Sequence, residues 1–365
     1  MIVSLRWMLQ LRHVHRWAFN NARPMMLRKG VVVIGSHVQG LFMRVSRFPG
    51  ADETVLGWDY KEALDGGKGS HQAIACARLG LPTHFVGCVG QDRLGDLGAS
   101  WMTDAGVDLS YLARSQQTAT GCGFVMINPE GIPAITTAMG ANAEFSSKEV
   151  DRAKSVLSQA KLVLITLEIP ISTALYAARL ARSLGAFTIL TPGPAEPVQS
   201  SELAGVDLLV PNENEASTLL SESPNIRQEP NWLADRLREY FGLKQVVITL
   251  GEKGAFVANG ETTQALPAFK VTAVDTPGAG DAFTAGLAFG LYHEASLVDA
   301  AIFGCLTAAR AVTVRESIPS FGTLAEIAEF ARVNRFDIPS GLQAVMDLNT
   351  RPTNNGGRGL QQQPT

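Results

Sequence analysis

The sequence DTPGAGD, at residues 275–281, stands immediately before a long helical pattern. Pro277 and the two glycines are poorly suited to a helix interior, so this segment predicts a loop that leads into a helix N-terminus. Free N–H groups at such a terminus, together with the helix dipole, favour an oxyanion or a phosphate. Asp281 would stand at the same terminus, where its carboxylate can take a proton from an attacking hydroxyl. An ordinary Asp N-cap after a glycine-rich turn is the alternative interpretation.

Apolar, β-branched runs alternate with helical patterns along the rest of the chain. Buried strands are predicted at residues 31–35, 85–89, 162–167, 187–190, 208–210 and 246–250. Helices are predicted over residues 70–79, 94–105, 147–159, 172–184, 213–220, 232–240, 279–292, 297–314 and 323–332. This alternation predicts an α/β fold in which helices cover both faces of a mostly parallel central sheet.

The chain is expected to form one large domain over residues 30–335, with a lid and two end segments. Residues 37–62 and 120–137 alternate like strands, and predict a small antiparallel lid at one edge. Residues 1–29 are basic and free of acids, which predicts a disordered extension, a segment upstream of a natural start at Met25 or Met26, or an arginine-rich presequence. Residues 336–365 are expected to form a largely disordered C-terminal tail.

Composition excludes several classes of function. The 31 Lys and Arg residues against 34 Asp and Glu residues leave a net charge of −3, which argues against a nucleic-acid partner. No apolar run approaches 18 residues, so a membrane span is not expected. The four cysteines form no C-x-x-C motif and predict free thiols, which favours a reducing, cytoplasmic location.

Three further polar segments lie next to predicted strands or helices. In GGKG, at residues 66–69, three glycines around Lys68 permit close approach of a ligand, although a flexible turn explains them equally. In PNENE, at residues 211–215, Asn212 and Glu215 share one face of a first helical turn. They suit a hydrated Mg²⁺ ion near phosphates, while helix capping also explains Asn212. The segment TLGEKG, at residues 249–254, ends another strand in a turn.

Taken in this order, the four segments resemble the ribokinase-like family of carbohydrate kinases, also called the phosphofructokinase-B family. The resemblance covers about residues 30–335 and joins GGKGSHQA, at 66–73, and ARLG, at 77–80, with the complete DTPGAGD. It implies a ribokinase-like three-layer fold with a lid. It also implies that the protein phosphorylates a hydroxyl group with ATP and Mg²⁺.

The resemblance assigns roles to individual positions. Asp281 matches the general base, and the backbone N–H groups of Gly278, Ala279 and Gly280 match the anion hole. The positions that match the ATP and Mg²⁺ site are Asn212, Glu215, Thr249, Gly251, Gly254 and Gly280. A monovalent cation site, for K⁺, is implied at Asp275, Pro277, Ala311, Val314, Glu316 and Ser320.

The sugar end departs from ribokinase. The retained positions are Gly67, Lys68 and Glu168, whereas His71 replaces a sugar-binding Asn. Val38 and Gly40 stand where ribokinases place an Asn and an Asp that grip sugar hydroxyls. Because these hydrogen-bonding groups are lost, ribose is expected to be a poor substrate, and a larger or less hydroxylated acceptor is expected to use empty volume at Gly40. Replacing Val38 by Asn and Gly40 by Asp is then expected to improve ribose as a substrate.

The leading hypothesis is an ATP-dependent kinase for a small sugar or sugar-like alcohol. A nucleoside kinase is the alternative enzyme, because an apolar Val38 beside His71 suits a base. A sugar-binding regulator without catalysis is a third hypothesis, against which the intact DTPGAGD and N-x-x-E motifs argue. The resemblance further implies a homodimer formed through the lids, for which the apolar candidates are Leu41, Phe42, Val45 and Phe48.

Overall fold

A computed structural model of the protein describes residues 28–130, 132–222 and 228–350. Within these residues, nine strands form the main sheet in the order β13-β12-β11-β10-β9-β8-β1-β4-β5. Neighbouring strands from β5 to β11 are parallel, and β12 and β13 add an antiparallel edge. The strands are β1 (Val31–Ile34), β4 (Thr83–Gly90), β5 (Asp108–Ser115), β8 (Leu162–Thr166), β9 (Phe187–Thr191), β10 (Leu208–Leu209), β11 (Gln245–Thr249), β12 (Ala255–Ala258) and β13 (Thr263–Leu266).

Strand β1 lies inside the sheet, between β4 and β8, and all four of its side chains are apolar. Val31 and Val33 pack into the core on one face of the sheet, and Val32 and Ile34 pack into the core on the other. A continuous apolar run of this kind is what a parallel strand covered on both faces requires.

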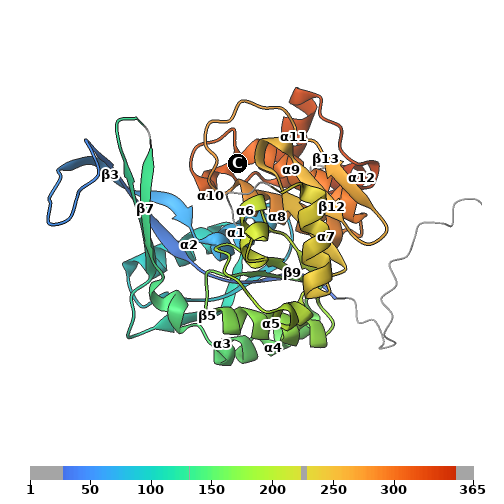
Figure 1. The fold of residues 1–365 in the computed structure, drawn as a ribbon, viewed down its shortest axis with the longest axis horizontal. Helices are drawn as coiled ribbons and strands as arrows, with labels where there is room; N and C mark the ends of the chain where they lie inside the picture. Colours follow the sequence, from blue (N-terminus) through green and yellow to red (C-terminus); the bar gives the residue numbers. More distant parts are fainter. Residues whose placement is uncertain (1–27, 131, 223–227, 351–365) are drawn as a thin grey trace, which may run out of the picture.

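Helices cover both faces of the sheet (Figure 1). The core that contains Val31 also includes α1 (Lys68–Arg78), α2 (Arg93–Asp104), α8 (Ala279–Tyr292), α9 (Leu297–Ala311), α10 (Ser317–Ser320), α11 (Leu324–Asn334) and α12 (Ser340–Thr350). The core that contains Val32 includes α3 (Ser147–Arg152), α4 (Lys154–Gln159), α5 (Ile171–Ser183), α6 (Glu213–Leu219) and α7 (Pro230–Phe241). The three layers confirm the predicted fold.

A second, four-stranded sheet forms the lid, in the order β3-β2-β6-β7. It projects from the body beside α2 (Figure 1). Two antiparallel hairpins build it, and they meet through the parallel pair β2–β6. The strands are β2 (Val38–Val45), β3 (Gly57–Gly66), β6 (Gly121–Ile127) and β7 (Pro133–Ala138).

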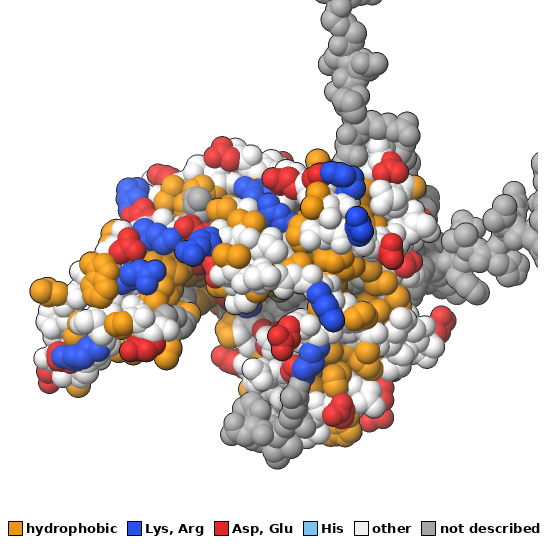
Figure 2. Space-filling model, turned by 90° about the horizontal axis from the view of Figure 1, so that it is seen from above, with side chains coloured by type: hydrophobic (Ala, Val, Ile, Leu, Met, Phe, Trp, Pro, Cys, Tyr) orange, Lys and Arg blue, Asp and Glu red, His pale blue; other side chains and the backbone are white. Residues whose placement is uncertain are grey.

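The proposed dimer contacts on the lid need correction. Leu41 and Val45 are buried within the chain itself, so they are not available to a partner. The exposed apolar side chains of β3 are Trp58 and Tyr60, with Leu56 just before them. Figure 2 shows hydrophobic side chains interspersed with charged ones on the projecting lid. Phe42 and Phe48 are half-buried, so only Leu41 and Val45 are removed from the predicted contact, and the homodimer stays a prediction.

Several elements differ from the sequence prediction. The predicted helix over 147–159 is two short helices, α3 and α4, separated at Ala153. Strands β5, β12 and β13 were not predicted. Residues 340–350 form α12 instead of a disordered tail, because Leu342 and Met346 lie one helical turn apart and are both buried in the core. Residues 1–27 and 351–365 lie outside the described residues. None of the described helices combines the length and apolarity needed to cross a bilayer.

The order of the parallel strands reverses at β1, which pairs with β4 on one side and with β8 on the other. In open α/β sheets, ligands bind beyond the carboxyl ends of the strands at such a reversal. Residues 35–37 leave β1 at this point and lead directly into the lid strand β2. We therefore expect the functional site to lie beyond the carboxyl ends of β1, β8 and β9.

Candidate active site

The loop DTPGAGD leads into the N-terminus of α8, as the sequence predicts. Gly278 caps this helix with a φ of +80°, and a Cβ atom there would lie 3.1 Å from Ser317 Cβ. Only glycine suits both the backbone conformation and this close approach. At Gly280 a Cβ atom would meet nothing within 4 Å, so the first turn faces open space. The N–H group of Ala279 donates to the carbonyl oxygen of Thr276 at 3.2 Å.

Asp281 is buried in the first turn of α8, and both of its carboxylate oxygens have partners on α1. The imidazole Nδ1 of His71 lies 3.1 Å from Oδ2, and the amide Nε2 of Gln72 donates to Oδ1 at 3.0 Å. Gln72 also donates to Thr191 Oγ1 at the end of β9, at 3.0 Å. These contacts fix the orientation of the Asp281 carboxylate from two sides.

His71 joins two carboxylates. Its Nε2 atom lies 2.9 Å from Asp65 Oδ1 at the end of β3, while its Nδ1 atom faces Asp281. Burial lowers the pKa of His71, but the hydrogen bonds and charges of Asp281 and Asp65 outweigh this and raise it to about 10. The Gly66 N–H group also points at Nε2, at 2.8 Å. The two carboxylates favour the charged form of the imidazole. The sequence assigned His71 to the sugar and missed Asp65 and Gln72, although Asp65 directly precedes the glycine motif.

Lys68 and Glu168 lie together at the start of α1. The backbone N–H group of Lys68 donates to Glu168 Oε2 at 2.8 Å, and the Ser36 hydroxyl donates to the same oxygen. Burial raises the pKa of Glu168, while the Ser36 hydrogen bond and the Lys68 charge act in the opposite direction. Glu168 thus joins the end of β8 to the end of β1 and to the glycine motif.

The Lys68 ammonium lies among three acids. Burial lowers its pKa, but the charges of Asp281, Glu215 and Glu168 outweigh burial and leave the pKa above its ordinary value. A Cβ atom on Gly193 would lie 3.0 Å from Lys68 Nζ and 2.4 Å from Glu215 Oε1. The chain can bring these two groups together because residue 193 is a glycine. Lys68 therefore connects the predicted base with the predicted magnesium motif.

Asn212 and Glu215 confirm the capping interpretation of their spacing, while their role toward Mg²⁺ stays a prediction. They form a capping box at the start of α6, in which Asn212 Oδ1 accepts from the Glu215 N–H group at 2.8 Å and Glu215 Oε2 accepts from the Asn212 N–H group at 2.9 Å. The other oxygen of Glu215 faces Gly193 and Lys68. One carboxylate thus caps a helix and also presents an oxygen to the site.

The turn after β11 lies beside Asn212, which forms an isolated parallel bridge with Thr249. Gly254 has a φ of +103°, and a Cβ atom there would lie 2.0 Å from the carbonyl oxygen of Leu266. Gly251 also has a positive φ, and a Cβ atom on it would meet nothing within 4 Å. The structure therefore brings together the two segments that the resemblance assigned to ATP.

The segments predicted to hold a monovalent cation also meet. Asp275 Oδ2 accepts from the Glu316 N–H group at 3.0 Å, and the Asp275 N–H group donates to the carbonyl oxygen of Val312. Two predicted carbonyl ligands already accept hydrogen bonds in this arrangement. The Ser320 carbonyl accepts from Arg310 Nη1 at 3.0 Å, and the Ala311 carbonyl accepts from the Val314 N–H group at 3.1 Å. Pro277 lies one residue before the Gly278 cap.

Val38 and Gly40 lie beside the glycine motif, but the expectation of empty volume at Gly40 is wrong. Val38 Cγ2 is 3.2 Å from the place of a Cβ atom on Gly67. A Cβ atom on Gly40 would lie 2.9 Å from Asp65 Oδ2 and 3.0 Å from Asp65 Cβ. Because Asp65 fills this space, an Asp added at position 40 would clash with it. The expected gain from the Val38→Asn and Gly40→Asp pair is therefore withdrawn.

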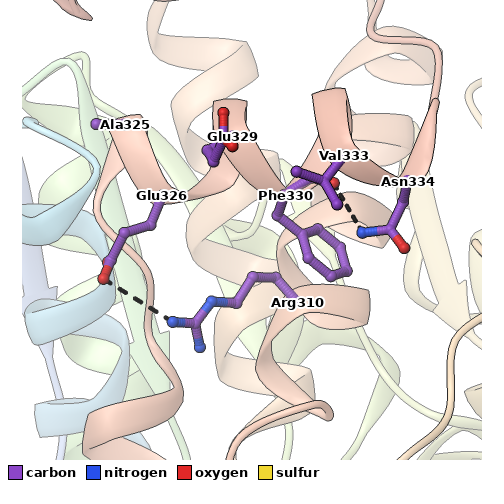
Figure 3. Close-up of a pocket in the computed structure, with 7 residues that line it drawn as sticks. All are labelled: Arg310, Ala325, Glu326, Glu329, Phe330, Val333 and Asn334. Atoms are coloured by element: carbon purple, nitrogen blue, oxygen red, sulfur yellow. Dashed lines mark hydrogen bonds and ion pairs between the residues drawn. The ribbon is translucent and has the colours of Figure 1, made fainter.

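A separate pocket of about 510 Å³ lies between α9 and α11 (Figure 3). Arg310 on α9 points across it toward Glu326, at 4.0 Å, while Phe330 and Val333 form its apolar wall. None of the residues predicted for catalysis, ATP or the sugar lines this pocket. It is therefore distinct from the cluster around Asp281.

Comparisons with known proteins match this chain along most of its length. Residues 28–324 match the domain described as pfkB family carbohydrate kinase. The ribokinase of Haemophilus influenzae is 33% identical over 304 residues, which is 83% of this chain and 99% of that protein. The deoxyribokinase of Salmonella typhimurium is 30% identical over 310 residues, with 83% and 99% covered. The structure of Arabidopsis thaliana ribokinase complexed with ribose and ATP has a TM-score of 0.76 at 29% identity, and covers 83% of this chain and 99% of that one.

Proposed function

Because the chain belongs to the pfkB family of carbohydrate kinases, which use ATP to phosphorylate sugars, we propose that it transfers the γ-phosphate of ATP to a hydroxyl of a small sugar. The observation that carries this proposal is the Asp281 carboxylate. It is buried at a glycine-capped helix N-terminus and held by His71 and Gln72. A phosphoryl acceptor needs a base at such a place, next to N–H groups that stabilise negative charge.

Asp281 takes the proton of the attacking hydroxyl as the bond to phosphorus forms. Each carboxylate oxygen accepts one hydrogen bond from α1, which leaves each a lone pair for the incoming proton. The partners keep the carboxylate from rotating away, so the base is positioned before the substrate arrives. The contribution of such a base is typically about 10²–10⁴-fold in rate.

Two parts of the protein stabilise negative charge on the transferring phosphoryl group: the N-terminus of α8 and the Lys68 side chain. The exposed first turn of α8, at Gly278 and Gly280, offers backbone N–H groups and the positive end of the helix dipole. Lys68 brings a full positive charge between Asp281 and Glu215.

The donor set at Glu215 fits an Mg²⁺ ion held through water. Glu215 Oε2 is bound in the α6 capping box, and Oε1 faces the site. Asn212 stands next to it at the cap, beside Thr249 and the turn that holds Gly251 and Gly254. When bound with ATP, Mg²⁺ supplies positive charge to the phosphate oxygens. Glu215 and Asn212 would orient its water ligands, which Mg²⁺ retains more readily than Ca²⁺.

A sugar suits the acceptor end better than a nucleoside. The nucleoside alternative placed His71 against a base, yet both imidazole nitrogens face carboxylates. Glu168 and Lys68 remain as polar anchors, and Val38 forms an apolar wall next to Gly67. A wall of this kind favours an acceptor that lacks one hydroxyl group at this point, because a hydroxyl there would lose its hydrogen-bonding partners.

The test is an ADP-release assay with purified protein, ATP and Mg²⁺, and a panel of acceptors. The panel contains D-ribose, 2-deoxy-D-ribose, larger polyols and nucleosides. We expect sugar-dependent ADP release, with kcat/KM for 2-deoxy-D-ribose at or above that for D-ribose. Use of nucleosides alone would identify a nucleoside kinase, and no turnover with any acceptor would support the non-catalytic regulator. A kcat/KM for D-ribose above about 10⁴ M⁻¹s⁻¹, with 2-deoxy-D-ribose tenfold poorer, would contradict the interpretation of Val38.

A further inference from the structure

The lid strand β3 contains a bulge opposite Gly40. Gln39 pairs with Gly66, and Leu41 pairs with Glu62, so the three residues 63–65 lie opposite the single residue Gly40. Gln39, fully buried, supports this irregularity because its Nε2 atom donates both to the Gly40 carbonyl and to the Ala63 carbonyl, at 3.0 and 2.9 Å. Bulges occur next to active sites, where they redirect a side chain.

The side chain redirected by this bulge is Asp65. Its Oδ2 atom lies 2.9 Å, and its Cβ atom 3.0 Å, from the place where a side chain on Gly40 would begin. Position 40 is where the family resemblance expects a sugar-binding carboxylate, and glycine stands there instead. Asp65 thus brings a carboxylate from β3 into the space that a carboxylate on β2 would need.

Asp65 is also connected to the base. Its Oδ1 atom lies 2.9 Å from His71 Nε2, and His71 Nδ1 lies 3.1 Å from Asp281 Oδ2. The Asp65 side chain is 28% exposed, whereas the side chains of His71 and Asp281 are below 10%. Burial raises the pKa of Asp65, but His71 and the Ser317 hydroxyl outweigh burial and leave it below its ordinary value. Asp65 is the partly exposed end of a series of three side chains, Asp65, His71 and Asp281, that leads to the base.

We propose that Asp65 is the sugar-binding carboxylate of this enzyme, delivered by the β3 bulge in place of a carboxylate at position 40. This inference rests on the proposed sugar kinase activity. Oδ1 is paired with His71, and the carboxylate also accepts from the Ser317 hydroxyl. A carboxylate has about four acceptor positions, so Oδ2, which faces Gly40, keeps a lone pair for one hydroxyl group of the sugar. A carboxylate with one oxygen committed holds fewer hydroxyls than a free one. The residue therefore sets specificity toward sugars that present a single hydroxyl at this point.

The first experiment compares Asp65→Asn with wild type, using D-ribose and 2-deoxy-D-ribose as probes. The amide keeps an oxygen for His71 but removes the charge that accepts from the sugar. We expect the KM for the better probe to rise by about 10- to 100-fold, as for loss of a charged hydrogen bond, with the KM for ATP unchanged within twofold. Glu62→Gln is the matched control, because Glu62 lies on the same strand and pairs with Arg93 at the surface.

The second experiment moves the carboxylate. Gly40→Asp alone places two side chains in one space, and we expect it to lower both stability and sugar affinity. Asp65→Gly alone removes the carboxylate and raises the KM for the sugar. The double variant with Asp65→Gly and Gly40→Asp relieves the clash and restores a carboxylate. We expect it to recover at least tenfold in sugar kcat/KM relative to Asp65→Gly.

The outcomes separate the inference from the function on which it rests. If wild type phosphorylates a sugar but Asp65→Asn leaves the sugar KM within twofold, the inference is wrong and the kinase function stands. If the double variant is no better than Asp65→Gly although it melts like wild type, the carboxylate at 65 does not stand in for one at 40. If wild type phosphorylates no sugar in the panel, the proposed function fails and the inference fails with it.

Discussion

Replacing His71 by Asn tests the cluster of Asp65, His71 and Asp281 through stability. The imidazole contacts Asp65 and Asp281 with its two nitrogens, at 2.9 and 3.1 Å, inside the protein. Asn is too short to contact both carboxylates and carries no charge. Removing one member of a buried ionic cluster leaves the others uncompensated, which typically costs about 3–5 kcal/mol. We expect a loss of this size in the free energy of unfolding near pH 6.5.

The pH dependence of the free energy of unfolding tests the charge of His71 more directly than the loss at a single pH. Folding raises the pKa of His71 from its ordinary value of 6.5 to about 10, so the folded protein keeps a proton that the unfolded chain releases. This stabilisation is complete below about pH 6.5 and is lost progressively as the pH rises to about 10. Between pH 7 and 9, the free energy of unfolding of wild type should therefore fall more steeply than that of His71→Asn, by up to about 1.4 kcal/mol per pH unit.

The assay is urea denaturation at pH 6.5, 7, 8 and 9, followed by circular dichroism for both proteins. Other groups that titrate in this range are present in both proteins, so their contributions cancel in the difference. His84→Asn is the control, because His84 is a partly exposed histidine that faces Asp108 on the main sheet. Equal pH slopes for wild type and His71→Asn would refute a charged His71 between the two acids.

Potassium is expected to raise kcat relative to a Tris buffer free of sodium and potassium, because the Asp275 and Glu316 segments meet beside the α8 cap; equal rates over a wide potassium range would count against the cation site. Deleting residues 1–24 should leave the melting temperature and kcat unchanged, because this segment precedes the first strand and has neither acidic residues nor strong helical periodicity; a large fall in melting temperature would show that the segment packs on the body. Leu342→Ala should lower the free energy of unfolding by about 2–5 kcal/mol in urea titrations, because Leu342 packs from α12 into the core; a loss below about 0.5 kcal/mol would mean that α12 adds little to the core.

The parts of the fold that the sequence predicted are those with strong local signals. The run of four apolar residues in β1 predicts a strand buried on both faces. The loop DTPGAGD predicts a helix start, and α8 begins at Ala279 as expected. Strand β5 has mostly half-exposed or exposed side chains at the edge of the sheet, so its apolar pattern is weak. Helix α12 was missed because its two buried residues adjoin a polar, repetitive terminus that dominates the composition.

Site residues that belong to one short motif could be predicted from the sequence. Site residues whose position depends on the pairing of two strands could not. Asn212 and Glu215 are three residues apart, so their shared helical turn could be inferred from spacing alone. Asp65 depends on a bulge between β2 and β3, which sequence periodicity does not reveal. For the same reason His71 was assigned to the sugar, since its contacts with Asp65 and Asp281 join segments up to 210 residues apart. Local sequence patterns predicted the motifs of the site. The pairing of β2 with β3 changed what is expected of Gly40 and His71.

The most direct test of the proposed mechanism is the kcat of Asp281→Asn with the best sugar of the panel, measured beside ATP binding by calorimetry. We expect kcat to fall by about 10²–10⁴-fold or more, while the dissociation constant for ATP stays within a few-fold of wild type. Asp299→Asn is the control, because Asp299 stands in the first turn of α9 as Asp281 stands in that of α8, and pairs with Ser296. A kcat for Asp281→Asn within a few-fold of wild type would contradict the role of Asp281 as the base.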